Sequence, residues 1–440
     1  MKELFFTLAD HAFAGLRGSE VLLLNFSGEV TDFVRFNHAQ VRQPMTVRQA
    51  QLAITLIDGL RRNELTLTLA GTPLQDRGTV TAAVQALRDE LPQLPEDPYL
   101  LYSTEATRSE RVDTGALPGA AAAIEDVVDA ARGTDLVGLL GSGPIMRGFA
   151  SSAGARHWHA VDAFLLDWSL YHAGDKAVKS AWSGSAWDRD ELERRIEEAR
   201  RQLAHLGTPP RTIEPGEYRA YLAPAAFDEL LWMLNWSGVS EKAQRTKQSC
   251  IQKLADGEAS FSPLVQIAED TAGGLAPAFD EAGFTKPPCV DLVRAGRHCG
   301  SMVSPRTGAE FGIPSNGAGE DEGMAAMAVG AGTLSEEGAL ASLDTGLYVG
   351  NLHYLNFSDR ANGRVTGMTR FATFWVEHGR IAAPVNVMRW DDSLYRLLGD
   401  NLEALTDRPQ WILDNRTYGQ RSVQTSRVPG ALLHAMAFTL

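Results

Sequence analysis

The chain has 440 residues, of which 44% are hydrophobic and 22% are charged, a composition typical of globular proteins. This length exceeds what one ordinary hydrophobic core supports, so we expect two domains. The net charge of −14 argues against a nucleic-acid-binding surface, which needs clustered basic residues. No apolar run approaches the roughly 20 residues of a membrane span. Three cysteines without CxxC spacing indicate a reducing compartment, so we expect a cytoplasmic protein.

The first part of the chain shows helical and strand-like patterns in turn. Residues 2–17 predict an amphipathic helix, and "EVLLLNFSGEVTDFVRFN" predicts a hairpin whose turn lies at Ser27-Gly28. "TVRQAQLAITLIDG" and "NELTLTLAG" continue the strand alternation, so an antiparallel meander is expected. A second helix is predicted over residues 79–94, where apolar residues keep helical spacing.

The next segment contains a glycine-rich run, a predicted strand and a predicted helix. "GLLGSGPIMRG" has Met146 where a dinucleotide-binding loop needs its third glycine, so we interpret it as a tight turn between strands. "RHWHAVDAFLLDWSLYH" alternates as a strand. The clearest helix of the chain covers residues 188–207, with Asp188 as its N-cap and Gly207 as its C-terminal stop.

The best linker signal is "TPPRTIEPGEY", a polar run with three prolines. We therefore divide the chain into residues 1–212 and residues 213–440. The fold class is α+β: the first domain is expected to carry helices on a mostly antiparallel sheet. The second is expected to be a large, mostly antiparallel, barrel-like β structure with few helices.

His157 and His159 are the best candidate metal ligands that the residues alone provide. They are two residues apart on a predicted strand, so both side chains face one side and could chelate a metal ion. No carboxylate or cysteine follows at ligand spacing, so we favour a strand with exposed histidines. An independent metal-dependent hydrolase using His157 and His159 stays as an alternative. No GxSxG serine motif and no His-Glu dipeptide occur.

Several longer segments resemble the TldD/PmbA family, in the family's order along nearly the whole chain. "PGEYRAYLAPAAFDELLWML" is similar to the opening of its C-terminal domain, and "PAFDEAGFTKPPCVDLVRAG" to its Asp-Glu-x-Gly segment. "GLYVGNLHYLNFSDRANGRVTGMTRFATFWVEHGRIAAPVNV" is similar to its late strands. Members of this family form pairs of related subunits that act on peptides, and one subunit carries zinc on a His-Glu-x-x-x-His helix and a C-terminal cysteine.

The resemblance also implies where the zinc site would lie in this chain. The first histidine position falls on Trp232, the glutamate on Met233, the second histidine on Ser237 and the cysteine on Asn415. Tryptophan, methionine, serine and asparagine do not replace these ligands, so we expect no catalytic residues, no metal ligands and no cofactor. We expect Trp232 and Trp236 to pack the vacated site or a subunit contact.

The resemblance therefore implies a TldE/PmbA-like subunit that is inactive alone, a pseudoenzyme. Its expected partner is a TldD-like zinc metallopeptidase, with which it would bind and process unfolded or leader peptides. A homodimer is expected in isolation. A homodimeric, non-enzymatic peptide-binding or scaffold protein is the other alternative. No nucleic acid and no membrane are expected as partners.

Overall fold

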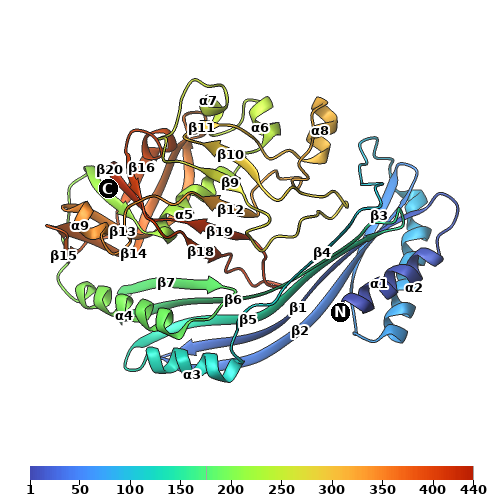
Figure 1. The fold of residues 1–440 in the computed structure, drawn as a ribbon, viewed down its shortest axis with the longest axis horizontal. Helices are drawn as coiled ribbons and strands as arrows, with labels where there is room; N and C mark the ends of the chain where they lie inside the picture. Colours follow the sequence, from blue (N-terminus) through green and yellow to red (C-terminus); the bar gives the residue numbers. More distant parts are fainter. Residues whose placement is uncertain (175, 440) are drawn as a thin grey trace.

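The computed structural model describes residues 1–174 and 176–439 and shows a mixed α+β fold, as predicted. In this part of the chain the strands form three sheets (Figure 1). One sheet is built from the first half of the chain, and the other two come from the second half. The two C-terminal sheets lie on one side of the long N-terminal sheet (Figure 1).

The N-terminal sheet has seven strands in the order β3-β2-β1-β5-β6-β4, and β7 also pairs with β6. Only the β4–β6 pairing is parallel, so the sheet is mostly antiparallel, as predicted. Its strands are β1 (Val21–Asn37), β2 (Gln40–Asp58), β3 (Arg61–Thr68), β4 (Arg108–Asp113), β5 (Asp135–Ser151), β6 (Arg156–Ala173) and β7 (Lys176–Gly184).

The turn predicted at Ser27-Gly28 is wrong. Strand β1 runs through it without a break, and Gly28 faces Ala50 of β2 in the ladder. A Cβ on Gly28 would lie 2.9 Å from the Phe26 ring, so close packing requires the glycine. The hairpin turns instead at His38 and Ala39, whose φ angles of 52° and 53° suit the type I′ turn that joins twisted strands.

The tight turn predicted within residues 138–148 is also wrong, because β5 is continuous there. Gly143 has a φ of 133°, and a Cβ on it would lie 2.2 Å from the Val30 carbonyl oxygen of the neighbouring strand. The glycine therefore permits a close backbone approach inside a sheet.

Helices pack against both ends of this sheet (Figure 1). α1 and α2 share a hydrophobic core with β1, β2 and β5, and α3 and α4 share a second core with β5, β6 and β7. The bounds are α1 (Lys2–Ala14), α2 (Pro73–Glu90), α3 (Ala120–Ala130) and α4 (Arg189–Leu206), and a 3₁₀ turn, η1 (Leu91–Gln93), follows α2. The three predicted helices are confirmed, and the Asp188 carboxylate caps α4 by accepting from the backbone N–H groups of Asp190 and Glu191.

The predicted barrel is also present. Strands β13, β8, β20, β16 and β14 pair in a ring, which the β13–β14 pairing closes. The ring strands are β8 (Gly216–Leu222), β13 (Gly346–Asp359), β14 (Arg364–Glu377), β16 (Arg389–Ser393) and β20 (Ala431–Phe438), with β15 (Arg380–Pro384) and β17 (Leu402–Leu405) attached.

A six-stranded sheet lies beside the barrel. Its strands, in spatial order, are β11 (Arg297–His298), β10 (Val290–Arg294), β9 (Ile267–Glu269), β12 (Ala326–Val329), β19 (Thr425–Val428) and β18 (Gln410–Leu413). The helices of the second half of the chain are short: α5 (Pro224–Trp232), η2 (Met233–Asn235), α6 (Glu241–Arg245), α7 (Gln252–Ala255), α8 (Pro305–Phe311), α9 (Ala339–Leu343), η3 (Arg360–Asn362) and α10 (Leu394–Leu397).

The two halves of the chain are joined by polar and apolar contacts. The Ser183 hydroxyl of β7 donates to the Trp411 carbonyl of β18 at 3.0 Å. Phe374 of β14 belongs to the same core as α4. Arg421 is buried and donates to the carbonyls of Gly143 and Ala163. No helix in the described part of the chain is long and apolar enough to cross a membrane.

Candidate functional site

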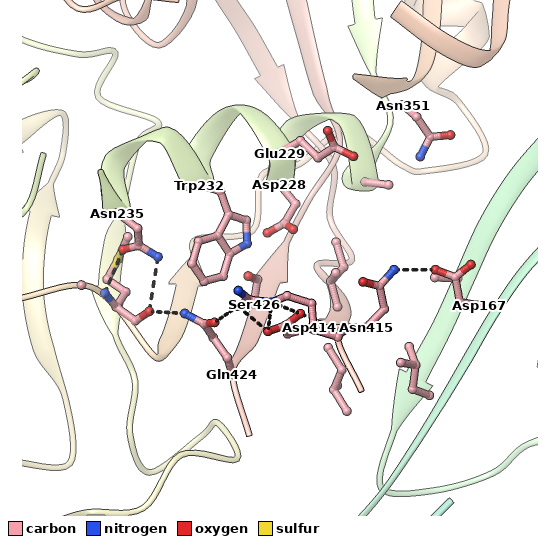
Figure 2. A pocket seen from close by; sticks show the side chains of 18 of the residues that line it. Asp167, Asp228, Glu229, Trp232, Asn235, Asn351, Asp414, Asn415, Gln424 and Ser426 are labelled. Atoms are coloured by element: carbon pink, nitrogen blue, oxygen red, sulfur yellow. Dashed lines mark hydrogen bonds and ion pairs between the residues drawn. The ribbon is translucent and has the colours of Figure 1, made fainter. Parts of the chain in front are cut away.

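A cavity of about 620 Å³ lies where α5 faces the N-terminal sheet. Five parts of the chain line it: β6 and β7 of the first sheet, helix α5 with the turn that follows it, the loop before β12, strand β13, and a C-terminal segment from β18 to β19. The polar residues of its lining include Asp167, Lys179, Asp228, Glu229, Asn351, Asp414, Asn415, Gln424 and Ser426 (Figure 2). This volume is within the range of small-ligand sites in proteins.

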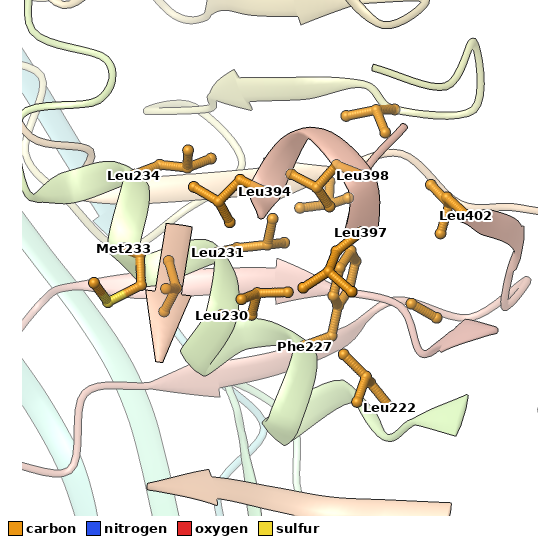
Figure 3. Close-up of a cluster of buried hydrophobic side chains, with 14 of the residues drawn as sticks. Leu222, Phe227, Leu230, Leu231, Met233, Leu234, Leu394, Leu397, Leu398 and Leu402 are labelled. Carbon is orange, nitrogen blue, oxygen red and sulfur yellow. The ribbon is translucent and has the colours of Figure 1, made fainter. Parts of the chain in front are cut away.

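Helix α5 has two faces of different character. Pro224 at its first turn fits the helix start, because a proline there loses no hydrogen bond. Phe227, Leu230 and Leu231 are fully buried in the core between the barrel and the neighbouring sheet (Figure 3). Asp228, at i+1 from Phe227, faces the cavity together with the side chains that follow it at helical spacing. The packing of one face thus presents the other to the cavity.

Asp228 is the most deeply buried carboxyl of the cavity, with 5% of its surface exposed. Its Oδ1 atom has no hydrogen-bond partner in the described part of the chain. Burial raises the pKa of Asp228 to about 7, and the Ser426 hydroxyl and Trp232 indole beside it oppose this only in part (Figure 2). Asp228 therefore changes its charge near neutral pH.

A second carboxyl beside it behaves in the same way. Burial raises the pKa of Glu229 to about 7; nearby Lys179 opposes this change, and the charge of Asp228 adds to it. The remaining charges of the cavity are better compensated. Asp167 accepts a hydrogen bond from Asn415 at 2.8 Å and pairs with Lys179 at 3.4 Å. Asp228 and Glu229 are thus two neighbouring carboxyls of the cavity that could each interact with a bound cation.

Asp414 and Arg416 form the other compensated pair, with 2.6 Å between Oδ2 and Nη2. Arg416 also donates to the Gln424 side chain at 3.2 Å, and Gln424 donates to the Met324 carbonyl (Figure 2). This network ties the segment after β18 to the loop before β12. It leaves both charges partnered within the protein.

The positions matched to the family's zinc site do not all meet in this cavity. Trp232 and Asn415 line it, from opposite sides. Met233 is buried in the core on the other face of the helix (Figure 3). Ser237 has a φ of 76°, where the chain leaves the helix, and receives a hydrogen bond from Arg360 at 3.3 Å. The structure therefore brings two of these four residues to the cavity.

The two tryptophans differ in their surroundings. Trp232 ends α5, packs against the core on one side and lines the cavity on the other. Trp236 follows a 3₁₀ turn, is 48% exposed and lies 6.3 Å from the Phe357 ring in an edge-on arrangement. Both indoles line the space without filling it. Their role in packing or in a subunit contact stays a prediction.

The expectation that His157 and His159 are exposed is wrong, because residues of the C-terminal half cover both. His157 lies between the Thr107 and Ser109 hydroxyls, at 3.1 and 2.7 Å, and stacks on Phe279. His159 Nε2 lies 2.9 Å from the Leu275 carbonyl, and burial lowers the pKa of His159 to about 4. Both rings serve the contact between the two halves of the chain.

The cavity does not suit the zinc ion of the family's metallopeptidases. Zinc in proteins is held by histidine, cysteine and carboxylate side chains in a tetrahedral set. The lining holds no histidine or cysteine. In the described residues, no three histidine, cysteine, aspartate or glutamate side chains are grouped to hold a metal ion.

Sequence reasoning missed the residues that make this cavity chemically distinctive, namely Asp228, Glu229, Asn351 and Ser426. One signal was present: "PAAFDELLWML" places two adjacent acids inside an otherwise apolar helix. A buried helix seldom carries acids unless they are paired or functional. No local signal pointed to Asn351 or Ser426, which lie on strands far away in the sequence.

Comparison with known proteins supports the family resemblance. Residues 215–439 match the model of the PmbA/TldA metallopeptidase C-terminal domain. TldE from Thermococcus kodakarensis has a similar structure, with a TM-score of 0.78 and 14% identity over 99% of this chain and 100% of that one. None of the curated proteins searched matches the chain.

Two further solved structures share the fold. A putative modulator of a DNA gyrase from Thermotoga maritima has a TM-score of 0.73 and 14% identity, covering 99% of this chain and 100% of that one. A putative modulator of DNA gyrase from Bacteroides thetaiotaomicron has a TM-score of 0.73 and 15% identity, covering 100% and 98%. Because the family model spans more than half of the sequence, the chain belongs to the TldD/PmbA family, which is related to metallopeptidases.

Proposed function

We propose that this chain is a non-catalytic, TldE/PmbA-like subunit that pairs with a TldD-like zinc metallopeptidase in the cytoplasm. Together the two subunits would bind and process unfolded or leader peptides. The observation that carries this proposal is the cavity at α5. It occupies the region of the family domain where the resemblance puts the zinc helix, yet Trp232 and Asn415 stand at matched ligand positions.

The fold of the second half supports a role in peptide binding. Extended peptides bind proteins by adding to sheet edges and by placing alternate side chains in pockets. Here a pocket lies between the N-terminal sheet and the C-terminal sheets. The division at residues 212 and 213 is part of this proposal. It is supported by the first sheet, which is built from residues 21–184, and by the other two, built from residues 216–438.

The net charge of −14 does not favour a nucleic acid as the partner, although two related structures are named after DNA gyrase modulation. The alternative of an independent hydrolase is not favoured either. His157 and His159 are each engaged by neighbouring groups in the contact between the halves.

Co-expression tests the pairing directly. The chain is produced with a TldD-like protein from the same source that carries the His-Glu-x-x-x-His helix. Size-exclusion chromatography then shows whether the two proteins elute together, and the fractions are assayed on an unfolded peptide. We expect a complex that cleaves the peptide faster than the TldD-like protein does alone. Replacing the histidines of that partner should abolish cleavage, whereas the Leu74→Ala variant of this chain, changed at an 88% exposed position, should leave cleavage unchanged.

The same preparation separates the alternatives. No complex and no change in cleavage would refute the pairing. A stable homodimer that binds peptide but never joins the TldD-like protein would favour the scaffold function. Stoichiometric zinc in this chain alone, lost in the His157→Ala variant, would favour the independent hydrolase.

A further inference from the structure

Two polar side-chain atoms around the α5 cavity, Oδ1 of Asp228 and Oδ1 of Asn351, have no hydrogen-bond partner in the described part of the chain. Their residues are 5% and 7% exposed. Buried polar atoms without partners are rare in proteins, since each costs about 1–3 kcal/mol. Both atoms line the same cavity, where a ligand with hydrogen-bond donors could satisfy them in place of water.

The chemistry of these atoms limits what can bind. The Asn351 side-chain oxygen only accepts hydrogen bonds, and so does the Asp228 carboxylate in its ionised form, so a ligand that donates suits both. Asp228 and Glu229 can each carry a negative charge, while the two cations of the lining, Lys179 and Arg416, are paired with other carboxylates. The ligand should therefore be positively charged as well as a donor.

The shape and the apolar wall of the cavity favour an organic cation over a metal ion. The Trp232 indole lies beside the Asp228 carboxyl and offers an apolar surface for a methylene chain (Figure 2). A divalent cation would need several carboxylates grouped around one point, and no such group occurs in residues 1–174 and 176–439.

We propose that the cavity beside α5 binds a cationic nitrogen group of a peptide, held by the Asp228 and Glu229 carboxyls, with the Asn351 side-chain oxygen as a further acceptor in the lining. The group can come from an amino terminus, a lysine or an arginine, which share several N–H donors and a positive charge. This inference rests on the proposed peptide-binding function and names the feature of the peptide that the chain selects.

Proton release adds an independent readout. Asp228 and Glu229 on α5 are the carboxyls that would hold the ligand, and Lys179 on β7 lowers the pKa of Glu229. The other charged groups of the lining are Asp167 on β6, Asp321 before β12, and Asp414 and Arg416 after β18. Burial raises the pKa of both carboxyls, so each holds a proton for part of the time at neutral pH. A bound cation favours their ionised forms. Binding of a lysine or arginine peptide should therefore release protons and strengthen as pH rises through about 7.

Isothermal titration calorimetry on the full chain tests the proposal with matched peptides. One uncharged, unstructured sequence is prepared with a free amino terminus, with an acetylated terminus, and as acetylated forms that contain one lysine, one arginine or one norleucine. At least one cationic form should bind about tenfold more tightly than its neutral counterpart, as expected for hydrogen bonds to a charged group. The peptide form that binds more tightly identifies whether the cationic group comes from an amino terminus, a lysine or an arginine. Equal affinity for all five forms would overturn the proposal.

Two variants locate the effect. Asp228→Asn should abolish the preference for the cationic form and the proton release. The control, Asp321→Asn, changes the same charge at an exposed carboxyl of the same cavity and should keep both. Equal losses in the two variants would show diffuse attraction only and would refute the assignment.

Agmatine, which carries an amine and a guanidine, separates this inference from the peptide function. Binding of agmatine that depends on Asp228 supports the cation site even when no peptide binds. Peptide binding without any preference for charge supports the proposed function and rejects the cation site. Tight binding of Mg²⁺ or Zn²⁺ that Asp228→Asn removes would also reject it.

Discussion

The Asp228→Asn variant should change how the stability of the protein depends on pH. The folded protein raises the pKa of Asp228 from the ordinary 3.8 to about 7, so it holds a proton that the unfolded chain has already lost. The contribution of Asp228 is therefore most favourable below 3.8 and is lost as pH rises through about 7. At about 1.4 kcal/mol for each pH unit, the ionised carboxyl costs the folded state about 4 kcal/mol above that range.

Asparagine has nearly the same shape but no charge to bury, so the variant lacks this loss. Between pH 5 and pH 8 the wild-type protein should lose about 3 kcal/mol more free energy of unfolding than the variant. At pH 8 the variant should be the more stable protein. Glu229 titrates in both proteins, but the Asp228 charge adds to the rise of its pKa only in the wild type, so its contribution changes the difference in the same direction.

Urea denaturation at pH 5, 6, 7 and 8, followed by circular dichroism, measures this difference. The Asp321→Asn variant is the control: its carboxyl is exposed, so its stability should follow the wild-type curve within about 0.5 kcal/mol. The reasoning would be refuted if the free energies of unfolding of the wild type and of Asp228→Asn changed with pH in parallel, within about 1 kcal/mol. That threshold is the effect of one typical mutation. The result also shows whether the variant is folded, as the binding experiment requires.

Two further pairs of substitutions test the packing of α5 and of the N-terminal sheet. Leu230→Ala should lower the free energy of unfolding by about 2–5 kcal/mol, because it leaves a cavity on the buried face of α5, whereas Leu74→Ala at an 88% exposed position should cost under about 0.5 kcal/mol. Gly143→Ala should cost at least about 2 kcal/mol, since its Cβ would meet the Val30 carbonyl at 2.2 Å. Gly78→Ala, in open space within α2, should instead stabilise the protein by about 0.5–1 kcal/mol. Thermal or urea melting of the four variants checks all of these, and a Gly143→Ala variant as stable as Gly78→Ala would contradict the close approach of β1 and β5.

Local chemistry in the sequence predicted much of the fold. The 188–207 helix could be predicted because Asp188, Gly207 and a regular apolar stripe all act within a few residues of each other. The N-terminal meander followed from alternation with period two, which depends only on one face of each strand being buried. The barrel-like second half was expected from the family resemblance and from the loss of helical patterns there.

Glycines misled the prediction because their role depends on a neighbouring strand. Gly28 and Gly143 have the local character of turn residues, but they lie inside long strands where Phe26 and the Val30 backbone come close. His157 and His159 were misjudged for the same reason, since the groups that bury them come from remote parts of the chain. Periodicity describes one strand and carries no information about what packs on it.

The cavity beside α5 shows most clearly which features depend on the local sequence and which depend on the tertiary structure. The sequence by itself determined the amphipathic α5 helix, the absence of histidine and cysteine near it, and the acids within "DELLWM". Only the tertiary structure decided that Asp228 faces a cavity while Met233 is buried in the core, and that Asn351 and Ser426 join Asp228 there. The physical reason is distance along the chain: burial, unmet hydrogen bonds and raised pKa values arise between segments that meet only after folding.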